Sequence, residues 1–190
     1  MSGSGPPSGR SGVSLLTVRH APVDAQGVCY GQRDVPTLVS AEEVAARLLP
    51  DVVRFGPATV WSSDALRCFE PAGLLAHRLE VEHRVDLRIR ELTYGAWEGR
   101  LWSEIPPAEL DEWNVDWLTR SPPGGETVLE LASRVRNWWE ALPAGSHFLL
   151  AHAGVVHCLD VLADGLAWEE TLHLRLDYLE ARHFRREVAV

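Results

Sequence analysis

Two short apolar runs in this sequence each lead into a histidine. Residues 15–18 precede the pair Arg19–His20, and the stretch HFLLAH ends at His152. A neutral imidazole can attack phosphorus and form a covalent phosphohistidine. A neighbouring guanidinium can bind phosphoryl oxygens through paired hydrogen bonds. The pair therefore points to phosphoryl chemistry, although a polar loop that caps a buried strand would have the same sequence.

Arg67 stands where the stretch SSDALR passes from an expected strand into a helix that should begin near Asp64. A cation in the first turn of a helix opposes the helix dipole, whereas an anion bound at that helix end would make the cation favourable. Ser62 and Ser63 occupy the same strand end. A solvated arginine is the alternative, but the two serines favour a phosphoryl-binding role.

Glu91 closes the alternating stretch VDLRIREL, in which Val85, Leu87 and Ile89 would share one face of a strand. A carboxylate that continues an apolar face should be partly desolvated, which suits it to donate a proton as a general acid. The alternative is that the strand ends at Arg90, which would leave Glu91 in a surface loop.

His152 lies between an expected strand and an expected helix, where backbone N–H groups are free to bind an anion. The alternative is a core histidine that is satisfied by one hydrogen bond. His152 and His157 are five residues apart and would not share a helix face, and the sequence has no H-E-x-x-H motif. We therefore expect neither a metal site nor a cofactor.

Apolar runs and helical periodicity alternate along the chain, which predicts an α/β fold with a mostly parallel, doubly wound sheet between two layers of helices. Strands are expected at residues 15–18, 58–63, 85–92 and 147–152, and helices at residues 40–50, 63–79, 127–142 and 154–164. Ligands of such sheets bind at the carboxyl ends of the strands. The two histidines, Ser62 and Ser63 all fall there.

Helix boundaries can be read from a few residue types. Pro50 is expected to end the first helix and Pro71 to kink the second, and Gly165 is expected to close the last. Capping-box spacing marks two helix starts, at Ser40 with Glu43 and at Thr127 with Glu130.

Two segments carry weaker signals. Residues 94–123 are expected to be irregular, and their tryptophans either anchor a long loop or form an apolar lid over the site, or do both. These tryptophans are Trp97, Trp102, Trp113 and Trp117. The stretch LHLRLDYLE alternates, which favours a terminal strand or hairpin.

Composition limits the range of partners. The chain has 190 residues and a net charge of −9, which argues against nucleic acid or an anionic membrane as the main partner but not against a small phosphorylated substrate. There is no apolar run of the length that a membrane span needs. Three separated cysteines fit a reducing cytoplasm. We expect a disordered tail over residues 1–12 and a single domain over residues 13–190, with a homodimer left open.

Five blocks of the sequence resemble the histidine phosphatase superfamily, also called phosphoglycerate mutase-like. VRHAPVD resembles its Arg-His-Gly signature, and SSDALRCFEPA is similar to its Ser-Ser-x-x-x-Arg-x-x-Glu-Thr-Ala block. RELTYGAWEG, GGET and AHAG are similar to its glutamate block, its Gly-Glu-Ser turn and its second histidine. The blocks come in the right order and cover nearly the whole chain after the tail, so together they are specific.

The resemblance implies a role for each matching residue. His20 would be the nucleophile, and Glu91 would donate a proton to the leaving oxygen. Arg19, Arg67 and His152 would bind the phosphoryl group and stabilise its transition state, so His152 counts as both catalytic and substrate-binding. Water would then hydrolyse the phosphohistidine, and the reaction needs no metal.

The sequence departs from the family pattern at several places. Ala21 replaces the signature glycine, Pro71 replaces a threonine, and APVD lacks the Ser-x-x-Asn run of the mutases. The stretches GVCYGQRDVP, RELTYGAWEG, PPGGET and LRLDY look most like alpha-ribazole phosphatases, which remove a 5′-phosphate in cobalamin assembly, although Gln32–Arg33 departs from their pattern. A phosphoglycerate mutase-type enzyme and a non-catalytic phospholigand-binding protein are the alternatives.

Overall fold

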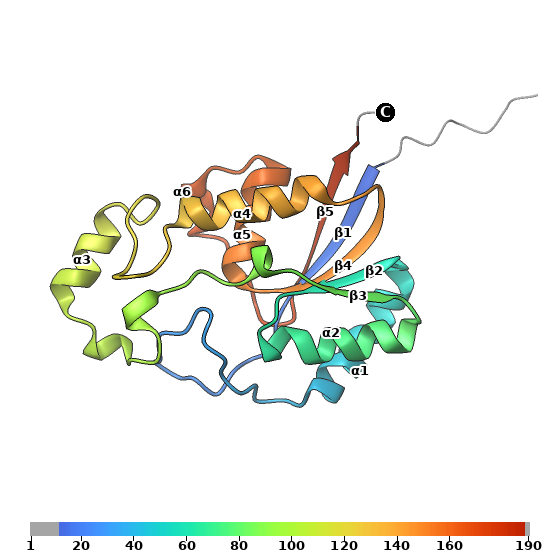
Figure 1. Ribbon diagram of the computed structural model, residues 1–190, viewed down its shortest axis with the longest axis horizontal. Coiled ribbons are helices and arrows are strands. Elements are labelled where there is room, and N and C mark those ends of the chain that lie inside the picture. Colours follow the sequence, from blue (N-terminus) through green and yellow to red (C-terminus); the bar gives the residue numbers. More distant parts are fainter. Residues whose placement is uncertain (1–11, 189–190) are drawn as a thin grey trace, which may run out of the picture.

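The computed structural model describes residues 12–188, and a five-stranded sheet lies at the centre of this range, in the order β3-β2-β4-β1-β5 (Figure 1). Strands β1 to β4 are parallel, and β5 pairs antiparallel with β1 at the edge. The strands are β1 (Gly12–Arg19), β2 (Thr59–Ser62), β3 (Glu82–Val85), β4 (Gly145–Ala151) and β5 (Ala181–Glu187). Residues 1–11, most of the expected disordered tail, lie outside the described residues.

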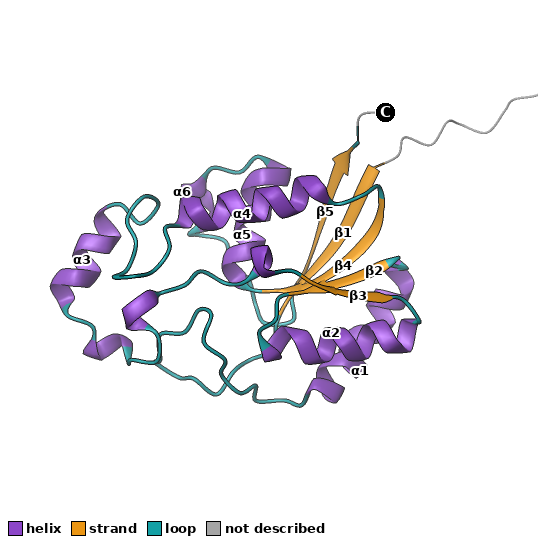
Figure 2. Cartoon of the chain, viewed as in Figure 1, coloured by secondary structure: helices purple, strands orange, loops and turns teal. Residues whose placement is uncertain are grey.

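Helices cover both faces of this sheet, which confirms the three-layer αβα fold (Figure 2). One face carries α1 and α2, the other carries α4 and α5 with the short α6, and α3 lies away from the sheet (Figure 1). The helices are α1 (Ala41–Phe55), α2 (Leu66–Leu79), α3 (Pro107–Val115), α4 (Val128–Ala141), α5 (Ala153–Asp164) and α6 (Trp168–Thr171). None of the helices within residues 12–188 is both long enough and apolar enough to cross a membrane.

Strand β4 is buried on both faces, which explains why it reads as an uninterrupted apolar run. Phe148 and Leu150 pack into the cluster under α1 and α2. Leu149 and Ala151 pack into the cluster under α4 and α5. This two-sided packing fixes the register of β4, and therefore the point at which His152 leaves the sheet.

The start of α1 agrees with its prediction, but its end does not. Ser40 and Glu43 form the expected capping box. Pro50, however, lies inside the helix, which continues to Phe55 and ends at Gly56 in the left-handed conformation. A proline costs one backbone hydrogen bond, but the buried face continues past it through Val52, so packing overrides the local signal.

The other helix signals agree better with the structure. Thr127 and Glu130 form the second capping box, and Gly165 caps α5 with φ of 73°. Pro71 lies inside α2, as expected. That helix begins at Leu66, slightly after the position expected near Asp64.

The strand predicted at residues 85–92 is wrong. Strand β3 ends at Val85, and a 3₁₀ turn over Leu87–Ile89 follows. Asp86 starts this turn by accepting a hydrogen bond from the Arg88 backbone N–H. Val85 and Leu87 are exposed and only Ile89 is buried, so the alternation did not mark one face of a strand. Glu91 consequently lies in a loop.

Two further expectations need correction. Residues 94–123 contain α3 and two 3₁₀ turns, so the segment is less irregular than expected. The alternating stretch LHLRLDYLE forms turns, and the terminal strand begins after it at Ala181. Leu179 has φ of 59° in this stretch, which an extended strand does not allow.

Candidate active site

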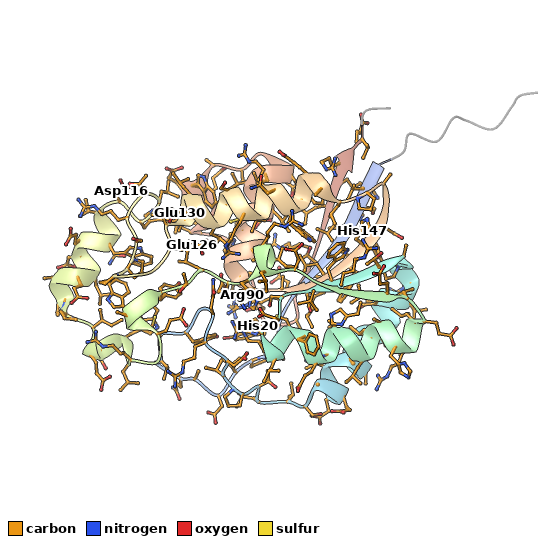
Figure 3. All side chains as sticks on the ribbon, in the orientation of Figure 1. His20, Arg90, Asp116, Glu126, Glu130 and His147 are labelled. Carbon is orange, nitrogen blue, oxygen red and sulfur yellow. The ribbon has the colours of Figure 1, made fainter. Side chains whose placement is uncertain are left out.

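His20 is the first residue after β1, near the middle of the molecule (Figure 3). Its backbone N–H donates to the carbonyl of Ala151 at 2.8 Å, which ties it to the end of β4. Its Nδ1 lies 2.7 Å from the carbonyl oxygen of Ala21. A carbonyl only accepts, so Nδ1 carries the proton, and the lone pair of Nε2 is left for a nucleophilic role.

The environment of His20 keeps its ring neutral. The side chain is 3% exposed. Burial is the largest cause that lowers its pKa from 6.5 to about 3, followed by the positive charge of Arg67 and, more weakly, that of Arg19. The hydrogen bond to Ala21 acts in the opposite direction but is outweighed. A neutral imidazole is the form that can attack phosphorus.

His152 follows β4 and lies beside His20, with 5.5 Å between the ring centroids. Nη2 of Arg67 lies 3.3 Å from Nδ1 of His152, and Oγ of Ser63 lies 2.8 Å from its Nε2. A guanidinium can only donate, so Nδ1 accepts and Nε2–H donates to Ser63. Burial, followed by the charge of Arg67, holds the pKa of His152 well below its usual value.

Arg67 is held by the loop that precedes α1. It is 3% exposed, as buried as His20. Its Nη1 donates to the carbonyl of Arg33 at 3.0 Å, and its Nη2 donates to the carbonyl of Gly31 at 2.5 Å. These neutral acceptors fix the guanidinium without cancelling its charge, so the charge stays available to an anion.

Both arginines of the site keep an unpaired N–H group. Arg19 donates from Nη1 to the carbonyl of Leu176 at 2.7 Å. The Nε–H groups of Arg19 and Arg67 are buried and have no hydrogen-bond partner among residues 12–188. Buried donors without an acceptor are rare and costly. The Nε–H groups of Arg182 and Arg186 are unpartnered too within this range, so the feature that marks the site is that the charges of Arg19 and Arg67 both act on His20.

Glu91 reaches the site from its loop and not from a strand. The backbone N–H of Leu92 donates to its Oε1 at 2.8 Å, and that of Gly154 donates to its Oε2 at 3.2 Å. Gly154 lies in the first turn of α5, directly after His152. A Cβ at this position would lie 2.3 Å from Oε1 of Glu91. Glycine is therefore required for the carboxylate to approach this helix end.

Arg134 of α4 positions the Glu91 loop, and no role was predicted for it from the sequence. Its guanidinium donates to the carbonyls of Arg88, Arg90 and Glu91 at 2.6 to 2.9 Å. It also forms a two-pronged ion pair with Glu126, at 2.6 and 2.9 Å. Glu126 is the glutamate of the GGET block, so that block was the available signal.

Glu98 positions the loop that holds Arg67, and it too was missed. Its carboxylate accepts hydrogen bonds from the backbone N–H groups of Gln32, Arg33 and Tyr94. The same stretch, RELTYGAWEG, contains both Glu91 and Glu98. The carboxylate of Glu91 therefore binds the helix end beside His152, and the carboxylate of Glu98 holds the loop that contacts Arg67.

Two of the departures from the family pattern, Ala21 and Pro71, have buried side chains. Ala21 is fully buried in the cluster under α1 and α2, so its extra methyl group packs into the core. Pro71 is buried within α2. No group of three or more His, Cys, Asp or Glu side chains within the described range is placed to hold a metal ion.

The tryptophans of the segment 94–123 pack mainly on one another. Trp97 is buried, and Trp102 and Trp113 lie edge-on to it at 6.4 and 5.9 Å between ring centroids. Trp117 packs against Trp168 at 6.2 Å. These contacts support the anchoring role, and the lid stays a prediction.

Comparison with known proteins defines the class. A sequence model of the histidine phosphatase superfamily (branch 1) matches residues 15–187. Glucosyl-3-phosphoglycerate phosphatase of Mycobacterium tuberculosis H37Rv is 33% identical over 163 residues, covering 76% of this chain and 72% of that protein. A Serratia proteamaculans protein named "Probable phosphoglycerate mutase GpmB" is 31% identical over 174 residues, covering 86% and 80%.

A solved structure shows the same fold. The alpha-ribazole phosphatase from Shigella flexneri superposes with a TM-score of 0.76 and 21% identity, covering 93% of this chain and 95% of that one. With the family match, this confirms the resemblance seen in the sequence. The chain belongs to the histidine phosphatase superfamily, a class of phosphatases and mutases that act on small phosphorylated substrates.

Proposed function

We propose that this protein is a metal-independent phosphomonoesterase that works through a phosphohistidine at His20. The observation that carries the proposal is a buried, neutral His20 with Nε2 unprotonated, beside two arginines whose buried Nε–H groups lack acceptors. Phosphoryl transfer spreads negative charge over the equatorial oxygens, so fixed positive charge is the main catalytic requirement. Arg19 and Arg67 meet this requirement without a metal.

The first step moves the phosphoryl group to the protein. The lone pair of Nε2 of His20 forms a bond to phosphorus as the ester P–O bond breaks. Glu91 gives a proton to the departing oxygen, which leaves as an alcohol. Nδ1–H of His20 stays bonded to the carbonyl of Ala21, which stabilises the positive charge on the phosphorylated ring.

The second step releases phosphate. Glu91, now a carboxylate held by the N–H groups of Leu92 and Gly154, takes a proton from water. The water oxygen bonds to phosphorus, the N–P bond breaks, and its electrons return to Nε2 of His20. The same carboxyl group thus acts as an acid and then as a base.

The names of the two relatives and of the structural neighbour point to three different reactions. Among these we propose hydrolysis of a phosphate ester rather than mutase activity. The absence of the Ser-x-x-Asn run after His20 supports a hydrolase. Alpha-ribazole 5′-phosphate is the first substrate to test, and the glucosyl-3-phosphoglycerate phosphatase relative adds sugar-linked phosphoglycerates. We also propose a single domain that acts in the cytoplasm.

Phosphate release from para-nitrophenyl phosphate in the presence of EDTA tests the proposal. We expect wild type to turn over, and His20→Ala to lose the activity while staying folded. His173→Ala, which changes an exposed histidine, is the matched control and should behave as wild type. Activity that persists in His20→Ala would contradict the phosphohistidine route, and activity that EDTA removes would contradict metal independence.

A substrate panel separates the remaining functions. Alpha-ribazole 5′-phosphate, sugar phosphates and 3-phosphoglycerate should be followed under the same conditions. Sustained isomerisation of 3-phosphoglycerate would favour a mutase. Tight binding of these esters by a folded wild type that releases no phosphate would favour a non-catalytic phospholigand-binding protein.

A further inference from the structure

Two tyrosines lie over the two arginines of the site. The ring of Tyr178 stacks on the guanidinium of Arg19, with 3.9 Å from its central carbon to the ring centroid. The ring of Tyr30 lies over Arg67 at 5.4 Å. Tyr178 also lies 5.7 Å from the ring of His20. The tyrosines therefore flank the position beside His20 where the proposed reaction would place the phosphoryl group.

The hydroxyl groups of the two tyrosines approach each other beside this position. Their hydroxyl oxygens are 3.4 Å apart, although Tyr30 comes from the loop before α1 and Tyr178 from the segment before β5. This distance is longer than the usual hydroxyl–hydroxyl bond of about 2.8 Å, so the contact is weak and easily separated.

The backbone beside Tyr178 is held in an unusual conformation. Leu179 has φ of 59°, in the left-handed region that bulky residues rarely adopt. Its N–H donates to the carbonyl of Arg19 at 3.0 Å, and the N–H of Arg19 donates to the carbonyl of Glu180 at 3.2 Å. Such strain persists only where the surroundings fix it, and it concentrates at functional sites. Here the two hydrogen bonds tie the backbone next to Tyr178 to the end of β1, beside Arg19.

We propose that Tyr30 and Tyr178 determine specificity by closing the phosphoryl pocket around the ester linkage. This inference rests on the proposed phosphatase function. The hydroxyl contact opens to admit the phosphoryl group and then leaves a narrow passage for the leaving group. A phosphate on a primary CH₂ carbon fits this passage, whereas a phosphate on a secondary carbon places two substituents against the rings. The protein therefore prefers primary phosphate esters.

Glycerol 1-phosphate and glycerol 2-phosphate test this preference, because they are isomers that differ in the branching next to the ester oxygen. We expect wild type to favour the primary ester in kcat/KM by at least about tenfold, the scale of discrimination that one misplaced carbon causes in a fitted pocket. Tyr178→Ala should bring this ratio close to one. Tyr30→Phe and Tyr178→Phe keep the rings and should lower it less.

The ratio separates specificity from a merely structural role. Tyr178→Ala also loosens Arg19, so its activity on both esters should fall, but a structural defect alone would leave the ratio unchanged. Leu172→Ala is the matched control, since this side chain is exposed on the same segment and outside the site. It should keep the wild-type ratio.

Binding provides a readout that does not depend on turnover. The dissociation constants of the two glycerol phosphates can be measured by calorimetry on His20→Ala, with and without Tyr178→Ala. We expect the preference for the primary ester to be present in the first protein and lost in the second. Absence of hydrolysis in wild type would overturn the phosphatase proposal while this binding preference still tests the tyrosines. Equal binding of both esters, or a preference that survives Tyr178→Ala, would overturn their role.

Discussion

The two halves of the proposed catalytic site are held in place by different means. His20 and His152 leave the ends of the neighbouring parallel strands β1 and β4, whose register pairs Arg19 with Ala151. Glu91, in contrast, lies in a loop and is not held by strand pairing. Its position depends on hydrogen bonds from the first turn of α5 and from Arg134 of α4.

The two halves should therefore respond differently to single substitutions. The histidine half is fixed by buried apolar packing, which many side chains share. The glutamate half is fixed by a few polar contacts, each of which is specific. Loss of one polar contact should therefore displace Glu91 while leaving His20 in place, and the predictions below test this contrast.

Arg67→Met should cause the largest loss among the supporting residues, because Arg67 serves the histidine half directly. It removes a buried cation that contacts His152 and that we propose binds the phosphoryl group. We expect kcat/KM for para-nitrophenyl phosphate to fall by about 10²- to 10³-fold, as for loss of one preorganised donor. A fall of less than tenfold in steady-state assays would show that Arg67 does not contact the phosphoryl group.

Arg134→Met should affect only the glutamate half. Loss of proton donation costs about a hundredfold or more where the leaving group needs a proton. We therefore expect kcat for glycerol 1-phosphate to fall by about that factor, and kcat for para-nitrophenyl phosphate to change little, because its leaving group departs without a proton. Equal losses on both substrates would mean that Arg134 does not act through Glu91.

The same substitution has an effect on stability. Arg134 and Glu126 are 19% and 13% exposed, and leaving one partner of such a partly buried pair unsatisfied costs about 1–3 kcal/mol of unfolding free energy. Adding Glu126→Gln removes the unpaired carboxylate and should restore part of the loss in urea unfolding. The substrate selectivity of the double variant should stay as in Arg134→Met.

The pH dependence of stability reports on the histidine half. The pKa of His20 falls from 6.5 in the unfolded chain to about 3 in the folded protein, so the unfolded state binds the proton more readily. Its contribution to stability is therefore complete above pH 6.5 and is lost as the pH falls toward 3. His20→Gln should reduce the slope of unfolding free energy by about 1.4 kcal/mol per pH unit between pH 6 and 4. An unchanged slope would contradict a buried neutral imidazole.

Ser40→Ala should give the smallest effect and serves as a control outside both halves. It removes the side chain that caps α1. We expect a loss of about 1 kcal/mol in unfolding free energy, with unchanged kcat and KM. A change in kcat would indicate that α1 is coupled to the site.

The same contrast explains how far the sequence could predict the molecule. Strands β1 and β4 were predicted because both are buried runs, and the placement of His20 and His152 follows from where these strands end. The strand at residues 85–92 was wrong because alternation does not show whether a face is covered, and Val85 and Leu87 are exposed. Pro50 was misread because tertiary packing carries α1 past it.

The polar contacts that position Glu91 could not be predicted from the sequence, for a different reason. Arg134 contacts Arg88, Arg90 and Glu91 from more than 40 residues away in the chain. The GGET block marks Glu126, which pairs with Arg134, but no local pattern marks Arg134 itself. The role of Glu91 came from the family resemblance, because the argument for its face rested on a strand that does not form there.

Trapping the phosphorylated protein is the most direct test of the proposed phosphohistidine at His20. Wild type should be mixed with a rapidly hydrolysed phosphate ester and quenched in alkali within one turnover, because the P–N bond is labile in acid. Mass spectrometry of the digested protein should then find a phosphoryl group on the imidazole of His20, and Glu91→Gln should prolong its lifetime. Phosphate release without any phosphorylated His20, or a phosphoryl group on another residue, would show that the reaction does not proceed through His20.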